Sequence, residues 1–219
     1  MASRPKQAEP RPVPRLYLMT PRVDDSATFT TALTAALTAG DVAAVLLRLA
    51  EADERTLINR AKALGDVVQK TGAALLLDGA VDLVARAGAD GAHLSGIDDF
   101  TGALERLKPE RIAGVGSLDT RHDAMTAAEA GADYLMFGDP DRHGERPDFA
   151  AIVERVAWWA EVFEAPCVAY AASIAEIEPL VTAGADFIAL GDWVWGDPEA
   201  VAVTIADAAQ YMRLPENTV

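Results

Sequence analysis

Charged side chains follow several short apolar runs of this 219-residue chain, and their types could hold a phosphate group and a divalent cation. Arg48 comes directly after the run VLL, and its guanidinium fork matches the geometry of a phosphate. Asp98 follows the segment GAHLSGI, where a carboxylate could hold a hard cation such as magnesium. Arg142, His143 and Arg146 form a basic cluster in an otherwise acidic chain and could close over a phosphate.

Each of these residues also has a structural interpretation. Arg48 could form a salt bridge with Glu51 or Asp53, and Asp98 could cap the helix that follows it. The basic cluster could be an ordinary solvated loop. His93 lies inside a short apolar segment, where a histidine with a satisfied hydrogen bond is more common than a catalytic one. The choice depends on the elements that position these side chains.

A repeated phrase indicates what those elements are. Residues 87–96 read AGADGAHLSG, residues 130–139 read AGADYLMFGD and residues 183–192 read AGADFIALGD, with a weaker copy over residues 38–48. Glycine suits the left-handed position that closes a helix, and the apolar run after it is typical of a strand buried on both faces. A unit that recurs with one buried strand per copy predicts stacked β/α modules.

The chain divides into eight such strand–helix pairs with no element left over. Alternating strands and helices indicate parallel pairing with right-handed crossovers. Eight units of similar length favour closure into a single α/β domain, a (β/α)8 TIM barrel, over an open doubly wound sheet. We expect the barrel to span residues 15–212. The proline-rich residues 1–14 are interpreted as a disordered N-terminal arm and residues 213–219 as a C-terminal tail.

In this fold, ligands bind at the C-terminal ends of the strands, whereas the opposite end stabilises the barrel. The AGAD half of the repeat is expected at the stabilising end. The residues expected at the mouth of the barrel are Thr20, Arg48, Asp78, Ser95, Asp98, Gly116, Ser117, and the segments 139–146, 170–173 and 191–195. This mixture of cations, carboxylates and small residues suits a phosphate-bearing ligand with a divalent cation.

Composition excludes several classes of protein. The formal net charge of −15 and the pI near 4.5 argue against nucleic acid or an anionic membrane surface as a partner. No apolar stretch reaches the length of a membrane span, and the N-terminus lacks the apolar core of a signal peptide. The single cysteine, Cys167, lies in the apolar run PCVAYA, so we expect a buried, inert thiol and a cytoplasmic protein.

From about Arg15 to Met212 the chain resembles the thiamine phosphate synthase family, which includes thiazole tautomerase, and we interpret it as a divergent member. The most specific match is the GADG-H-L element with the aspartate that follows it, within the segment from Val81 to Asp98. The other matching segments are RLYLMT, the run that ends at Arg48, IAGVGS, AGADYLMFG, PCVA and AGADFIAL.

The resemblance implies a transferase that joins a pyrimidine methyl diphosphate to a thiazole phosphate and releases pyrophosphate with the help of Mg²⁺. It implies that Arg48 and Arg146 bind diphosphate and that Ser117 contacts substrate. Backbone N–H groups near Gly191 would hold phosphate, and Asp98 would be a magnesium ligand. The implied partners are small phosphorylated or heterocyclic substrates and a second copy of the chain in a homodimer.

The chain departs from the family pattern at several positions. Leu46 and Ala50 replace polar residues around the strand-end arginine. The pair Asp78-Gly79 replaces an Asn-Asp pair, which removes a second magnesium carboxylate. Ala171-Ala172 replaces a Gly-Gly pair, and Asp192 stands where the family has a serine-like residue. An added Cβ and an added carboxylate both oppose phosphate binding at the ends of the last two strands.

Two other hypotheses therefore accompany the transferase. The departures favour a non-catalytic or repurposed paralogue that binds a small molecule with less phosphate, or none. A thiazole tautomerase would need a catalytic histidine, and His122 is expected inside a helix. Gly116 also stands where the family has a serine.

Overall fold

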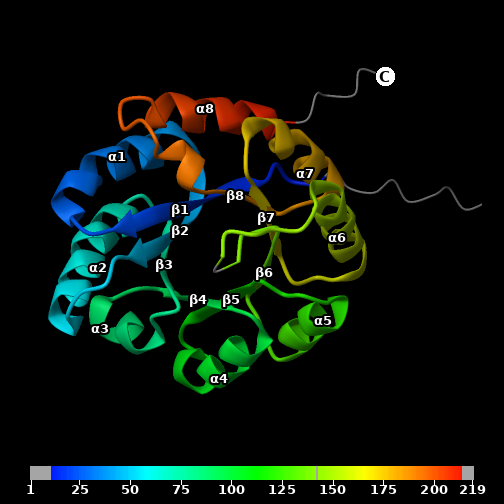
Figure 1. Cartoon of the computed structure of the whole chain (residues 1–219), viewed down its shortest axis with the longest axis horizontal. Helices are drawn as coiled ribbons and strands as arrows, with labels where there is room; N and C mark the ends of the chain where they lie inside the picture. The colour runs from blue at the N-terminus through cyan, green and yellow to red at the C-terminus, as the bar shows by residue number, and fades with distance from the viewer. Residues whose placement is uncertain (1–10, 142, 214–219) are drawn as a thin grey trace, which may run out of the picture.

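Eight parallel strands close into a barrel. A computed structural model describes residues 11–141 and 143–213. The strands pair in chain order from β1 to β8, and β8 pairs back with β1. The helices surround the strands, as the view along the barrel shows (Figure 1). The expected single (β/α)8 barrel is confirmed.

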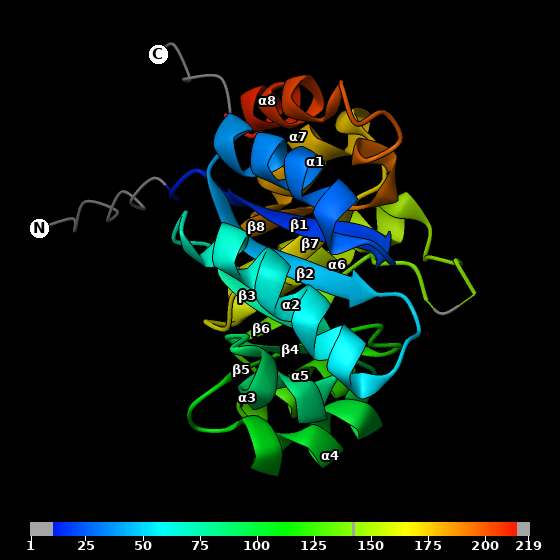
Figure 2. The ribbon, with the colours of Figure 1, turned by 90° about the vertical axis from the view of Figure 1, so that its left-hand side faces the viewer.

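The strands and helices alternate as predicted, and Figure 2 shows the helices of one side packed across the strands. The strands are β1 Arg15–Val23, β2 Val42–Leu49, β3 Ala74–Asp78, β4 Gly91–Ser95, β5 Ile112–Gly116, β6 Tyr134–Phe137, β7 Cys167–Ala171 and β8 Phe187–Leu190. The α-helices are α1 Ser26–Ala39, α2 Glu54–Gln69, α3 Val84–Ala87, α4 Ile97–Leu107, α5 Arg121–Glu129, α6 Phe149–Val162, α7 Ile177–Ala183 and α8 Val201–Tyr211. Short 3-10 helices are η1 Val81–Leu83, η2 Ile174–Glu176 and η3 Asp192–Val194.

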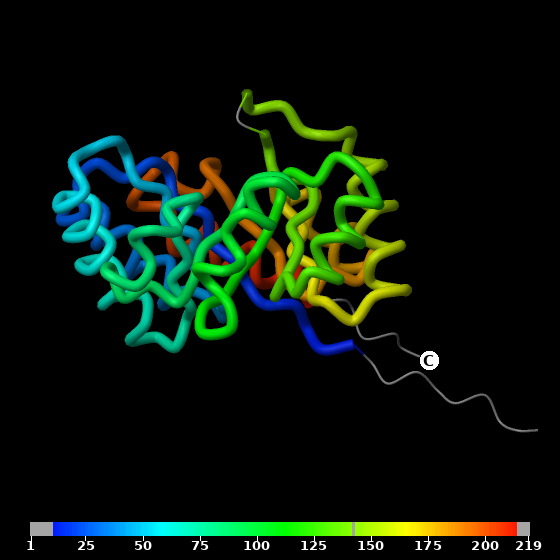
Figure 3. The backbone as a smooth tube through the Cα atoms, turned by 90° about the horizontal axis from the view of Figure 1, so that it is seen from below, coloured from blue at the N-terminus to red at the C-terminus, as the bar shows by residue number. Residues whose placement is uncertain are grey.

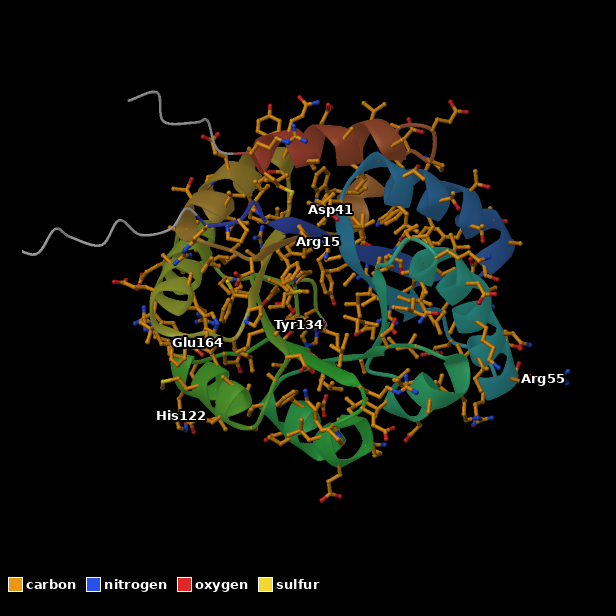
Figure 4. All side chains as sticks on the ribbon, turned by 180° about the vertical axis from the view of Figure 1, so that it is seen from behind. Arg15, Asp41, Arg55, His122, Tyr134 and Glu164 are labelled. Atoms are coloured by element: carbon orange, nitrogen blue, oxygen red, sulfur yellow. The ribbon has the colours of Figure 1, made fainter. Side chains whose placement is uncertain are left out.

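Apolar side chains fill two layers of the barrel. Successive residues of a strand point to opposite faces, so β2 supplies Val45 and Leu47 to the layer beneath the helices and Leu46 to the interior. Trp159 of α6 is fully buried in the outer layer. The inner cluster includes the tyrosine ring of Tyr134, which lies near the barrel axis in the view from behind (Figure 4). Both layers hold the strands in register at the mouth.

The aspartate of each AGAD copy binds the backbone of a neighbouring strand. The carboxylates accept backbone N–H groups as follows: Asp90 from Leu75 at 2.7 Å, Asp133 from Ala113 at 2.7 Å and Asp186 from Cys167 at 2.8 Å. The glycine before each aspartate has a positive φ of 71°, 95° or 99°, which places it in the left-handed region. The repeat is therefore structural, and its carboxylates clamp the end of the barrel opposite the mouth.

Strand β1 is longer than expected. It continues past Thr20 to Val23, and its register with β2 shifts between Met19 and Arg22. Pro21 lies inside this shift. Proline has no backbone N–H, so it is tolerated where the regular hydrogen bonding between the two strands is interrupted. Thr20 is consequently buried, and its hydroxyl accepts the backbone N–H of Arg48 at 3.0 Å. Thr20 therefore positions β2 and is not a residue of the open mouth.

The two ends of the chain extend beyond the described part. Residues 1–10 of the expected arm and residues 214–219 of the expected tail lie outside it. Within the expected arm, Arg11 donates hydrogen bonds to the backbone carbonyls of Gly184 at 3.1 Å and Ala160 at 2.7 Å. Among the described residues, no helix has the length and apolar character needed to cross a bilayer.

Candidate active site at the mouth of the barrel

The loops that follow the strands form the mouth of the barrel. The loop between β6 and α6 projects beyond the other loops at this end (Figure 3). It carries His143 and Arg146, while Arg142 of the expected basic cluster lies outside the described residues. The predicted phosphate binding therefore depends on which side chains of this loop and of the ends of β2, β5, β7 and β8 contact one another.

Arg48 lies at the mouth, as its position at the end of a buried run predicts. Its guanidinium donates to the backbone carbonyl of Thr20 and forms an ion pair with Asp192, which follows β8. The predicted alternative, a salt bridge with Glu51 or Asp53, is wrong. Asp53 instead caps α2 by accepting the backbone N–H of Thr56 at 3.1 Å, which satisfies its carboxylate locally.

Arg146 is held by a carboxylate of the protein itself. Its guanidinium nitrogen Nη1 donates to both carboxylate oxygens of Glu176 at 3.0 Å, and Nε donates to the Gly138 carbonyl at 3.1 Å. One Glu176 oxygen also accepts the backbone N–H of Ala172 at 2.8 Å. Glu176 therefore binds both Arg146, the arginine predicted to bind phosphate, and the Ala172 N–H, which belongs to the phosphate site predicted at the end of β7.

Tyr170 of β7 lies between these two ion pairs. The Arg146 guanidinium lies 5.5 Å from the centre of its ring. Burial raises the pKa of the Tyr170 hydroxyl, the charge of Asp192 raises it further, and Arg146 and Arg48 oppose the rise. A Cβ at Gly191 would lie 2.5 Å from the Tyr170 hydroxyl oxygen, so only glycine fits against this ring. The Gly191 position thus accommodates the tyrosine.

A carboxyl group and a hydroxyl group meet at the ends of β5 and β6. The Ser117 hydroxyl donates to Asp139 at 3.0 Å, and the Ser117 backbone N–H donates to the other carboxylate oxygen at 3.4 Å. Burial raises the pKa of Asp139 to about 6; the hydrogen bonds from Ser117 oppose the rise, and the charge of Asp78 adds to it. Asp139 can therefore hold or release a proton close to neutral pH.

A hydrogen-bonded chain of buried side chains lies beneath this carboxyl group, inside the barrel. The Tyr17 and Tyr134 hydroxyls are 2.8 Å apart, and the Tyr134 hydroxyl lies 2.9 Å from His93 Nδ1. Burial lowers the pKa of His93 to about 4, so the imidazole is neutral at physiological pH. The expectation that His93 is a satisfied core histidine is borne out by this geometry.

Within the described part of the chain, Asp98 forms no hydrogen bond or ion pair with Arg48 or Arg146, whose carboxylate partners are Asp192 and Glu176. It is exposed in the first turn of α4, whose N-cap is Gly96, so the N-cap alternative for Asp98 is wrong. No hydrogen bond or ion pair of its carboxylate is present within residues 11–141 and 143–213. In the same described residues, no three histidine, cysteine, aspartate or glutamate side chains are close enough to share a metal ion.

The structure also adds Glu176 to the site, which the sequence prediction missed. Glu176 lies in η2, four residues after Ala172, and no local pattern distinguishes it from the exposed Glu178 nearby. His122 lies in α5 on the outside of the barrel (Figure 4), so it cannot supply a histidine to the mouth. Cys167 is buried, as expected for an inert thiol.

These features define a (β/α)8-barrel protein with a charged candidate site at the C-terminal ends of its strands. The family model for thiamine monophosphate synthase matches residues 16–193. The chain therefore belongs to the thiamine monophosphate synthase family.

Curated relatives extend over most of the chain. It is 41% identical over 202 residues to the thiamine-phosphate synthase of Rhodospirillum centenum, with 91% of this chain and 98% of the relative covered. It is 37% identical over 210 residues to that of Hyphomonas neptunium, with 90% and 93% covered.

Solved structures share the fold. The thiamine phosphate pyrophosphorylase of Pyrococcus furiosus matches with a TM-score of 0.75 and 23% identity, covering 90% of this chain and 95% of that one. A 3-hexulose-6-phosphate synthase matches with a TM-score of 0.69 and 13% identity, covering 90% and 100%. At these identities the likeness concerns the barrel alone.

Proposed function

We propose that the protein is a thiamine-phosphate synthase, which joins a pyrimidine methyl diphosphate to a thiazole phosphate and releases pyrophosphate. The observation that carries this proposal is the placement of two arginines, Arg48 and Arg146, around Tyr170 at the mouth of a barrel of this family. Two guanidinium forks within one mouth suit a diphosphate, which offers several anionic oxygens.

In the proposed reaction, the bond between the pyrimidine methylene carbon and the diphosphate oxygen breaks, and pyrophosphate leaves with the bonding electrons. The thiazole nitrogen gives its lone pair to the same carbon to form the new C–N bond. Arg48 and Arg146 stabilise the negative charge that builds up on the leaving group. To do so, Arg48 must release Asp192 and Arg146 must release Glu176, and each arginine then binds phosphate oxygens instead. Part of the energy gained from phosphate is therefore offset by the loss of an existing ion pair.

Magnesium belongs to this proposal as a cofactor. Mg²⁺ commonly binds to one or two carboxylates together with substrate phosphates and water, so an exposed carboxylate with no partner in the described chain fits it. Asp98 is the residue we propose for that role. When bound, the ion would neutralise charge on the departing pyrophosphate.

Replacing Asp98 by asparagine is expected to weaken magnesium-dependent pyrophosphate binding about tenfold, because the amide keeps the shape of the side chain but loses its charge. Calorimetry with pyrophosphate at fixed magnesium concentrations measures the effect without relying on turnover. Asp99→Asn is the matched control, since Asp99 is also exposed in the first turn of α4. Equal pyrophosphate binding by the two variants would remove Asp98 from the proposed site.

A coupled assay with both substrates and magnesium tests the activity directly. We expect formation of thiamine phosphate together with one pyrophosphate per turnover. No product, together with no thiazole-phosphate binding by calorimetry, would refute the proposed function. The same preparations in an analytical ultracentrifuge test the expected homodimer. The expected absence of nucleic-acid binding and the expected cytoplasmic location follow from the net charge of −15 and the single cysteine.

One observation favours the second candidate, a binding protein for a ligand with little phosphate. Both predicted phosphate-binding arginines are already paired with carboxylates of the chain, and Glu176 also holds the Ala172 N–H. A ligand without phosphate would leave these contacts in place. Tighter binding of the unphosphorylated thiazole alcohol than of thiazole phosphate, with no turnover, would favour this candidate over the transferase.

Removing the carboxylate at Glu176 is expected to strengthen phosphate binding. In Glu176→Ala the Arg146 fork and the Ala172 N–H lose their internal anion, and we expect inorganic phosphate to bind about tenfold more tightly. Calorimetry with inorganic phosphate measures this. Glu178→Ala, an exposed residue of α7, is the matched control. Unchanged phosphate affinity in Glu176→Ala would show that Glu176 does not compete for the phosphate site.

A further inference from the structure

A small cavity opens beside the β5 and β6 ends of the mouth. Its volume is about 270 Å³, and its lining includes residues Met136 and Phe137 at the end of β6 together with Ser117 and Asp139. This is just below the range of about 300–1,000 Å³ that is typical of ligand pockets, which suits a single ring better than a large ligand. The cavity is therefore large enough for one heterocyclic ring.

The charges around the cavity disfavour an anion. Asp119 and Asp139 both line it. Arg155 also lines it, but its guanidinium donates to the backbone carbonyls of Leu118 at 2.7 Å and Asp119 at 3.2 Å. A phosphate placed between Asp119 and Asp139 would face both carboxylates while Arg155 is engaged by backbone carbonyls, whereas an uncharged ring avoids this cost.

The Asp139 carboxyl group is held in a fixed orientation. Ser117 binds both of its oxygens, and each oxygen keeps a lone pair for a further partner. The backbone of Ser117 has a φ of 50°, and among the described residues it is the only non-glycine residue with a positive φ. Backbone strain of this kind is concentrated at binding and catalytic sites.

Gly116 allows the carboxyl group to sit deep in the mouth. A Cβ at this position would lie 2.7 Å from Asp139 Oδ2 and 2.8 Å from His93 Nε2. The space that a side chain at this position would need is taken by these two polar groups. The hydrogen bond of 2.9 Å between His93 Nδ1 and the Tyr134 hydroxyl fixes the imidazole beneath the carboxyl group.

We propose that Asp139 is the specificity-determining residue for the heterocycle, and that it binds the edge of an aminopyrimidine on which a ring nitrogen and an exocyclic amine lie side by side. This inference rests on the proposed function and deepens it. A protonated carboxyl group offers one O–H donor and one acceptor, and the pyrimidine edge offers the complementary acceptor and N–H donor. If the proton moves to the ring nitrogen, the same two hydrogen bonds remain with their charges increased.

The chemistry of Asp139 suits either form. Its pKa of about 6 means that both the acid and the carboxylate are populated near neutral pH. A ring without the amine leaves one oxygen of the half-buried carboxyl group without its partner, which disfavours that ring. The preference for the amine is therefore the property that distinguishes this contact from simple burial of a ring.

The experiment compares two phosphate-free ligands by calorimetry: the hydroxymethyl aminopyrimidine and the same compound with hydrogen in place of the amine. The wild-type protein should bind the aminopyrimidine at least about tenfold more tightly. Asp139→Ala should abolish this preference, whereas Asp139→Asn should keep most of it because an amide also offers a donor and an acceptor. Thiazole-phosphate affinity should change less than about twofold in both variants.

Failure of this inference is distinguishable from failure of the proposed function. Equal binding of the two pyrimidines by the wild-type protein would overturn the role of Asp139, even if thiamine phosphate forms. So would an unchanged preference in Asp139→Ala. A preference that depends on Asp139 in a protein without turnover would support the inference and refute the activity. The wild-type comparison needs no variant, so it decides the matter even where a variant does not fold.

Discussion

Replacing Arg48 by alanine is expected to lower kcat/KM for the pyrimidine diphosphate by about 100- to 1,000-fold, the usual effect of removing one donor to a developing anion. Arg48 comes from β2 and is held by the Thr20 carbonyl, so its fork reaches the mouth with little freedom to reorganise. The Asp192 carboxylate that it leaves behind is largely exposed, with 70% of its side chain accessible, so the loss of the ion pair itself costs little stability.

Arg48→Lys and Arg106→Ala separate the causes of this loss. Lysine keeps the charge but has no planar fork, so we expect an intermediate kcat/KM for Arg48→Lys. Arg106 forms an exposed ion pair with Asp82 away from the mouth, and its removal should leave kcat/KM within about twofold of the wild type. Steady-state kinetics with thermal unfolding curves measure both effects. A wild-type kcat/KM in Arg48→Ala would exclude Arg48 from diphosphate binding.

Replacing Asp139 by asparagine is expected to stabilise the folded protein at pH 7 by about 2–3 kcal/mol. The folded state raises the pKa of Asp139 from an ordinary value of 3.8 to about 6, so between these values the folded chain binds a proton that the unfolded chain releases. The free energy of unfolding of the wild type therefore falls as pH rises from about 4 to about 6. Above pH 6 the ionised, buried carboxylate remains a constant cost.

Denaturant unfolding at several pH values tests this prediction. At pH 4 the wild type and Asp139→Asn should have similar free energies of unfolding, because the wild-type carboxyl group is then protonated. At pH 7 the variant should have the higher free energy of unfolding. Asp66→Asn, an exposed position on α2, is the matched control and should show no such opening. A variant that is less stable than the wild type at pH 7 would contradict the raised pKa. A substitution that stabilises the fold at this position would indicate that the wild-type residue is kept for a ligand.

The fold was predictable because its signals are local. Each AGAD copy combines a helix-closing glycine with a buried strand, and the sequence shows both without knowledge of the partners. The extension of β1 was not predictable, since it depends on how Pro21 interrupts pairing with β2. Helix caps are equally local: the Asp25 carboxylate caps α1 by accepting the backbone N–H of Ala27, two residues along the chain.

The site was predictable in position but not in pairing. Arg48 and Arg146 are at the mouth, as the ends of their strands require. Their partners Asp192 and Glu176 are 144 and 30 residues away along the chain. Closure of the barrel brings Asp192 to Arg48, and the pairing of β6 with β7 brings Glu176 to Arg146. The expected partners of Arg48 were its sequence neighbours, and one of these is instead used as a helix cap. Local spacing indicates which charges reach a surface but not which charges meet there.

The aspartate clamps at the far end of the barrel have a consequence for how such a protein changes over generations. Asp90, Asp133 and Asp186 hold three pairs of strands together at the end opposite the mouth. The residues that stabilise the barrel are thereby separate from the residues that line its mouth, so the two sets can change independently. A lineage can exchange the side chains around Tyr170 or Gly116 and keep its frame, which gives the barrel evolutionary latitude to acquire new ligands one substitution at a time.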